Sequence, residues 1–94
     1  KPIHVAGAGQ LIKAIGFCTG AAQGFIEQAV VMGCDAYLSG EISEPTVHTA
    51  RETGIHYFAA GHHATERYGV QAVGEFLAEK LGIEHVFVDI ANPV

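Results

Sequence analysis

The sequence predicts an α/β domain built on a mostly parallel sheet with helices on both faces, one half of a two-lobed fold. Short apolar runs alternate with stretches of helical period along the 94 residues, an order typical of parallel strands joined by right-handed crossovers. The strand runs are continuously apolar, as expected where both faces of a sheet are covered. Single glycines, not a linker, separate the runs, so residues 1–94 are expected to form a single α/β domain.

Eight elements are expected from the apolar pattern and its punctuation. They are strands at 3–6 and 12–18, a helix at 23–32, a strand at 35–39, a helix at 43–53, a strand at 55–60, a helix from about 62 to 81 and a strand at 84–90.

Each helix has its own start or stop signals. The first is predicted by apolar residues recurring at 25, 26, 29 and 30. The second opens with Ser43 or Glu44 as cap and Pro45 in the first turn, where a missing N–H costs nothing. The third carries Val70, Val73, Leu77 and Leu81 on one face. Glycines follow all three helices, at the position where a left-handed residue commonly ends a helix.

The composition limits the partners of this chain. Charged residues are only 16% of the sequence, below the roughly 25% of an average soluble domain, which favours a surface covered by another lobe or subunit. The opening Lys1-Pro2, without a preceding Met, favours the C-terminal part of a longer protein. Five scattered Lys and Arg within a net charge of −5 do not form a nucleic-acid footprint.

Nothing in the sequence indicates a membrane or an export route. No run approaches the roughly 20 apolar residues of a membrane span, and no signal peptide opens the chain. Two cysteines without framework spacing are typical of a reducing compartment. We therefore expect a cytoplasmic protein with no membrane partner.

Three predicted strands end in similar glycine turns, Thr19-Gly20-Ala21, Ser39-Gly40-Glu41 and Ala60-Gly61-His62. Ligands of open α/β sheets bind at the carboxyl ends of the strands. If the strands are parallel and adjacent, the turns converge on one edge, which would hold Thr19, Glu41, His62, His63 and Glu66.

The spacing of His62 and Glu66 predicts a pair of metal ligands. Residues four apart on a helix share a face, and imidazole with carboxylate suits zinc, manganese or iron. His63 with Glu66, three apart, is the competing pair, and spacing does not decide between them. A capping interaction or an exposed ion pair would give the same pattern, and two ligands are fewer than a catalytic zinc usually has.

Four segments together resemble a known family: CTG at 18–20, DAYLSGE at 35–41, GHHATER at 61–67 and VDIANP at 88–93. They are similar to the YbgI-type dinuclear metal-centre proteins, the Nif-three-like family often labelled GTP cyclohydrolase I type 2 homologues. The resemblance extends over nearly the whole chain.

The resemblance implies two α/β lobes that face one another across a pair of divalent metal ions, with zinc, manganese or iron as the metal. The family's Gly-His-x-x-x-Glu motif falls on His62 and Glu66, which would be metal ligands. Two His and an Asp would come from the protein's own N-terminal lobe, which is absent here. Family members also form homo-oligomers, as hexameric rings.

The preferred hypothesis is a metal-dependent hydrolase of cyclohydrolase type in which the metals activate water. Glu41 is a candidate catalytic base, and Thr19, Gly20 and His63 would face the substrate or support the ligands. The alternative is a non-catalytic, ring-forming scaffold or regulatory protein with structural metals. A third reading is a half-domain that holds neither metal nor activity.

Overall fold

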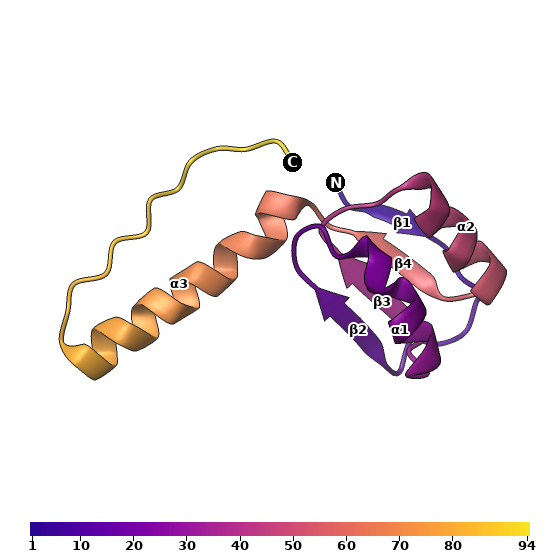
Figure 1. The fold of residues 1–94 in the computed structure, drawn as a ribbon, viewed down its shortest axis with the longest axis horizontal. Helices are drawn as coiled ribbons and strands as arrows, with labels where there is room; N and C mark the ends of the chain where they lie inside the picture. The colour runs from indigo at the N-terminus through magenta and orange to yellow at the C-terminus, as the bar shows by residue number, and fades with distance from the viewer.

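A four-stranded sheet with two helices packed on it forms the body of the molecule (Figure 1). The computed structural model describes all 94 residues. The elements are β1 (Ile3–Val5), β2 (Ile15–Cys18), a 3-10 turn η1 (Gln23–Phe25), α1 (Ile26–Val31), β3 (Ala36–Ser39), α2 (Glu44–Thr53), β4 (His56–Ala59) and α3 (His62–Leu81).

The strand order is β1-β4-β3-β2. β2, β3 and β4 run parallel to one another, and β1 pairs antiparallel with β4. The predicted α/β class with a mostly parallel sheet is therefore confirmed. No helix lies between β1 and β2, so no crossover requires β1 to be parallel.

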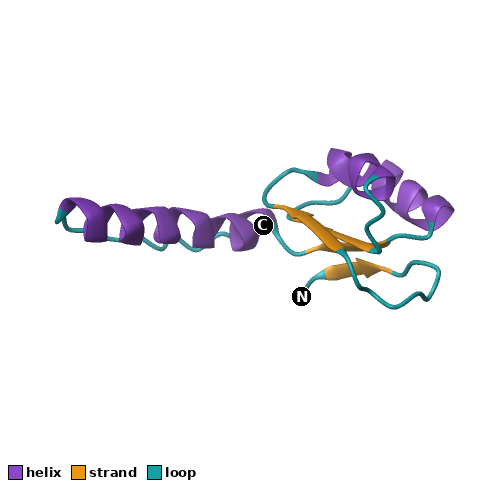
Figure 2. Ribbon diagram, turned by 90° about the horizontal axis from the view of Figure 1, so that it is seen from below, coloured by secondary structure: helices purple, strands orange, loops and turns teal.

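Both helices that connect the parallel strands lie on the same face of the sheet (Figure 2). The parallel strands follow one another steadily from β2 to β4, and right-handed crossovers taken in one direction place their helices on one side. Within this chain, helix cover is thus found on one face. Phe17, Leu38 and Phe58 pair across the other face, and Phe17 is 74% exposed.

The hydrophobic core lies between the sheet and its two helices. Alternate strand residues point into it, as the period of two in a strand requires. The cluster consists of Val5, Ile26, Ala29, Tyr37, Ala50, Ile55, Tyr57 and Ala59. The Tyr37 hydroxyl donates to the carbonyl of Ala22 at 2.8 Å, so this buried polar group is paired.

The predicted caps are found at both long helices. Ser43 precedes α2, and its backbone N–H and hydroxyl both lie within hydrogen-bond distance of the Thr46 hydroxyl, at 3.3 and 2.8 Å. Gly54 and Gly82 end α2 and α3 with left-handed backbones. No helix is both long and apolar enough to cross a membrane.

The last third of the chain projects from the sheet. α3 runs outward from the end of β4, and residues 83–94 return beside it in an extended path (Figure 1). None of the α3 residues is buried.

The predicted strand at 84–90 is wrong as secondary structure, because residues 83–93 make no backbone–backbone hydrogen bond. The exposure of its side chains nonetheless partly alternates, with His85 and Phe87 less exposed than their neighbours. Asp89 pairs with Arg67 of α3 at 2.7 Å, whereas Val86, Val88 and Ile90 are 68%, 70% and 72% exposed. The pattern is that of a strand, but a strand needs a partner, and this chain supplies none.

Candidate functional site

The three glycine turns meet at one edge of the sheet, as their sequences predict. The amide of Gly40 donates to the carbonyl of Gly20 at 3.0 Å, and the amide of Gly61 donates to the carbonyl of Gly40 at 3.0 Å. Consecutive backbone hydrogen bonds therefore connect the end of β2 to that of β3, and the end of β3 to that of β4. The residues that follow the three strands lie side by side.

Two of these glycines lie very close to neighbouring atoms, Gly40 to backbone and Gly20 to the side chain of Glu66. A Cβ on Gly40 would lie 2.6 Å from the Gly20 carbonyl oxygen and 2.8 Å from the Cα of His62. A Cβ on Gly20, whose φ is +71°, would overlap Oε1 of Glu66. The close approach of the turns requires glycine at position 40, and the left-handed backbone at position 20 favours it there.

His62 stands between two carboxylates. Its Nδ1 lies 2.5 Å from Oε1 of Glu41, at the end of β3, and its Nε2 lies 3.2 Å from Oε2 of Glu66, one turn along α3. Because α3 begins at His62, His62 and Glu66 are four apart on one helical face. The structure thus brings together His62, Glu66 and Glu41, which sequence reasoning singled out.

The carboxylates change the chemistry of the ring. The hydrogen bond to Glu41 is the main cause that raises the pKa of His62 above its usual value. Partial burial opposes this effect, and the negative charge of Glu66 adds to it. In the metal-free chain, Glu41 and Glu66 therefore stabilise the protonated ring.

Three residues that sequence reasoning missed hold the turns in place. The Tyr57 hydroxyl donates to the carbonyl of Glu41 at 2.6 Å, and the Ser39 hydroxyl donates to the carbonyl of Gly20 at 3.3 Å. The hydroxyl of Thr65 accepts the Gly20 amide at 3.1 Å. None of these contacts has a spacing rule, because each joins residues far apart in the sequence.

The remaining predicted site residues lie around the pair. His63 lines a hollow of about 340 Å³ together with His62, Glu66, Asn92 and Val94, and its backbone amide donates to the carbonyl of Val94 at 2.9 Å. Thr19 and Glu66 border another hollow, of about 520 Å³, that runs along α3. Gly20 is buried beneath them.

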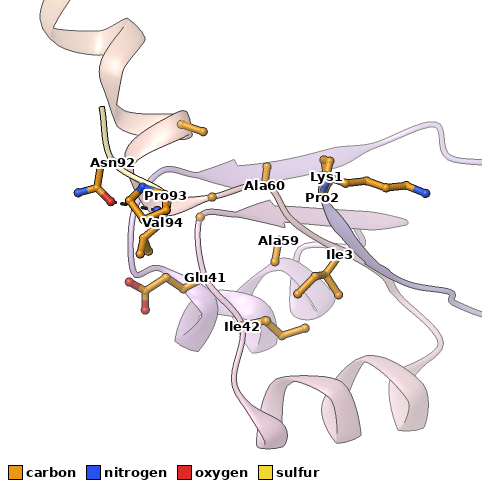
Figure 3. Close-up of a pocket in the computed structure, with 13 residues that line it drawn as sticks. Lys1, Pro2, Ile3, Glu41, Ile42, Ala59, Ala60, Asn92, Pro93 and Val94 are labelled. Atoms are coloured by element: carbon orange, nitrogen blue, oxygen red, sulfur yellow. Dashed lines mark hydrogen bonds between the residues drawn. The ribbon is translucent and has the colours of Figure 1, made fainter. Parts of the chain in front are cut away.

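The largest cavity, of about 600 Å³, borders Glu41 and does not reach Glu66 (Figure 3). The ends of β3 and β4, the start of the chain and residues 92–94 enclose it, with Glu41 and Lys1 as its charged residues. The smaller hollow beside His63 opens onto the His62–Glu66 pair. For metal chemistry the smaller hollow is therefore the relevant one, despite its size.

The donor set fits part of a metal centre. Nε2 of His62 and Oε2 of Glu66 face one another at 3.2 Å, and Glu41 occupies the other ring nitrogen, as the outer partner of a metal-binding His commonly does. No group of three or more His, Cys, Asp or Glu side chains in this chain is arranged to hold a metal ion. The residues present fit two ligands, and a complete centre would need others.

Comparisons with known proteins agree with this partial character. The sequence profile of the family described as Duf34/NIF3 (NGG1p interacting factor 3) matches residues 1–93. A Pseudomonas aeruginosa protein named GTP cyclohydrolase 1 type 2 homolog is 63% identical over 86 residues, which cover 92% of this chain and 34% of the relative. A Vibrio cholerae protein of the same name is 57% identical over 95 residues, covering 99% and 38%.

A solved structure has the same fold. The protein ybgI, described as of unknown function, superposes with a TM-score of 0.90 at 45% identity, over 100% of this chain and 38% of that protein. The chain therefore spans little more than a third of the length of the relatives it matches.

Proposed function

Because the chain belongs to the Duf34/NIF3 family, we propose that it contributes His62 and Glu66 to the metal centre of a hydrolase whose other ligands lie outside residues 1–94. One observation carries the proposal. The His62 ring is held between two carboxylates at the edge of the sheet where ligands of α/β proteins bind. The proposed cofactor is a pair of divalent ions, with zinc, manganese or iron compatible with the donors.

Each residue has a distinct part in this proposal. Nδ1–H of His62 donates a hydrogen bond to Glu41, which leaves Nε2, directed toward Glu66, free to act as a ligand. Glu66 adds an oxygen donor from the same helical face. A divalent metal bound there would supply Lewis-acid activation of water. Since Oε1 of Glu41 already contacts His62, we assign Glu41 an orienting role ahead of the predicted role as catalytic base.

Metal content of the full-length protein tests the assignment. We expect His62→Ala to bind at least one metal equivalent less than wild type, because the substitution removes one of the two metal donors in this chain. Elemental analysis measures the metal content. His48→Ala is the matched control, since His48 is exposed on α2 and outside the site. Equal metal content in wild type, His62→Ala and His48→Ala would reject the ligand assignment.

The reaction requires a separate test. The relatives are named GTP cyclohydrolase 1 type 2 homologs, so GTP is the first substrate to assay with metal-loaded full-length protein, followed by other nucleotides and phosphoesters. Turnover that is lost in His62→Ala and kept in His48→Ala supports a hydrolase. Absence of turnover with every substrate rejects it.

A ring-forming scaffold with structural metals is the second candidate. The observation that favours it is the exposure of α3, whose apolar residues are all outside the core. Such a surface fits cover by another lobe or subunit, and we propose a hexameric ring. Light scattering of the full-length protein tests the assembly, and a monomer would exclude it.

A further inference from the structure

We propose that Thr65 is a positioning residue of the His62–Glu66 pair, which it controls through the turn at Gly20 and without contact to a bound metal. The inference rests on the proposed function, because the pair is taken as a metal half-site. Thr65 lies within the GHHATER segment at 61–67, but its residue type and spacing assign it no role. Its position in the hydrogen-bond network of the site points to one.

The Thr65 hydroxyl joins two parts of the chain. It accepts the backbone N–H of Gly20 at 3.1 Å, and its own proton can go to the carbonyl of Gly61 at 2.8 Å or of His62 at 3.1 Å. One hydroxyl thus fastens the turn after β2 to the first turn of α3. An ordinary helical threonine makes only the bond to its own helix.

The fastened turn limits where the Glu66 carboxylate can lie. The Gly20 Cα sits so close to Glu66 that a single added methyl group would overlap Oε1 and lie 3.3 Å from Nε2 of His62. The Glu66 side chain is half exposed, and its polar contact is the one with Nε2 of His62. The Gly20 turn therefore limits the movement of the carboxylate on that side. Thr65 holds the amide of Gly20, while the Gly40 amide and the Ser39 hydroxyl hold its carbonyl.

Loss of the hydroxyl should loosen the amide side of the turn, which the Gly40 amide and the Ser39 hydroxyl still hold at the Gly20 carbonyl, with little change in side-chain volume. Thr65→Val removes both hydrogen bonds and leaves the Gly20 amide without its acceptor, whereas Thr65→Ser keeps the hydroxyl. Substitution of groups that orient metal ligands commonly weakens metal affinity about 10- to 100-fold. We expect a loss of about 10-fold for Thr65→Val and near wild-type affinity for Thr65→Ser.

The experiment measures the zinc and manganese affinity of the full-length protein by competition with a chromophoric chelator. Thr53→Val is the matched control, because the Thr53 hydroxyl makes the same bond to a carbonyl four residues back, at 2.7 Å, but touches no other turn. We expect its affinity to equal that of wild type. Equal affinities of Thr65→Val and wild type would overturn the proposal.

Two readouts do not depend on a bound metal. In metal-free protein, hydrogen exchange of the Gly20 amide should be slow in wild type and Thr65→Ser and fast in Thr65→Val. The ¹⁵N shift of His62 Nε2 should move in Thr65→Val only. If wild type binds no metal, the proposed function fails, and these two readouts decide the role of Thr65. Fast exchange at Gly20 in wild type rejects that role, even if Thr65→Val does not fold.

Discussion

Residues 3–61 and residues 62–94 differ in how much of their surface is buried. The first region, here called the sheet unit, contains all of the buried residues of the chain. The second, the helical arm of α3 and the returning tail, contains none. The radius of gyration of 15.9 Å exceeds the roughly 12 Å of a compact domain of this length. The arm therefore accounts for the elongated shape.

The difference matters because the candidate site lies at the junction. His62 and Glu66 belong to the arm, and Glu41 and Gly20 belong to the sheet unit. Hydrogen bonds from the sheet unit fix the start of α3, whereas further along the helix no residue is buried and the side-chain contacts to other parts of the chain are with the returning tail. A site that joins a well-packed region to an exposed one depends on the contacts at the junction itself.

The largest expected effect compares two isoleucines. Ile26 is 4% exposed in the core and Ile90 is 72% exposed on the arm. In the 94-residue chain, we expect Ile26→Ala to lower the free energy of unfolding by about 2–5 kcal/mol, because it leaves a cavity. Ile90→Ala should change it by less than about 0.5 kcal/mol. Urea unfolding followed by circular dichroism measures both.

The same pair of variants in the full-length protein sharpens the comparison. If another lobe or subunit covers the arm there, Ile90→Ala should become destabilising by about 1 kcal/mol or more, because its side chain would then be buried. An unchanged, near-zero effect would contradict the idea that the exposed face of the arm is covered.

A second comparison separates backbone strain from contact at the junction. Gly20 and Gly33 have φ values of +71° and +78°, but only Gly20 faces Glu66, whereas Gly33 has open space. Alanine at either should cost about 1–2 kcal/mol for the left-handed backbone. Only Gly20→Ala should also reduce metal content of the full-length protein. Equal metal loss in both variants would mean that strain alone disturbs the site.

Sequence reasoning predicted the features that local chemistry decides. Ser43, Gly54 and Gly82 end or begin helices where expected, because caps act over a few residues. The convergence of Gly20, Gly40 and Gly61 also followed, since parallel strands place their carboxyl ends together. The pairing of strands and the cover of the sheet depend on distant parts of the chain. For these features the sequence predicted a strand at 84–90 and helices on both faces, whereas this chain has no such strand and its connecting helices lie on one face.

The segment at 84–90 shows this limit most clearly. Its apolar run is typical of a strand, yet the segment has no backbone partner. Thr65 shows the same limit within the site, because its link to Gly20 spans 45 residues and has no periodic pattern. A local sequence pattern can predict that a segment is extended or helical, but it does not identify the distant residues that the segment contacts.

A third test compares two tyrosine hydroxyls within the sheet unit. Tyr37 donates to Ala22 at 2.8 Å in the core, and burial raises its pKa to about 12. Tyr57 donates to the Glu41 carbonyl at 2.6 Å, beneath the site. We expect each Tyr→Phe change to cost about 1 kcal/mol for the lost hydrogen bond. Only Tyr57→Phe should also weaken metal binding, as a chelator competition would measure.

The smallest effects concern pH, where the two regions respond in opposite directions. In the sheet unit, backbone amides of Ala14 and then Lys13 donate to Asp35 and lower its pKa. Asp35 therefore contributes stability above its unfolded pKa of about 3.9, and this contribution is lost as pH falls through the lower folded pKa. Asp35→Asn should be less stable than wild type near neutral pH, and the difference should shrink in acid.

At the junction the sign is reversed. The hydrogen bond to Glu41 raises the pKa of His62, so the protonated ring contributes stability that is complete below about pH 6.5, the unfolded value, and is lost as pH rises through the higher folded pKa. In an NMR titration of the metal-free chain, Glu41→Gln should return the pKa of His62 toward its usual value, and Asp35→Asn should leave it unchanged. A normal His62 pKa in wild type would mean that the Glu41 contact does not persist in solution, and the junction would then lack its main polar link.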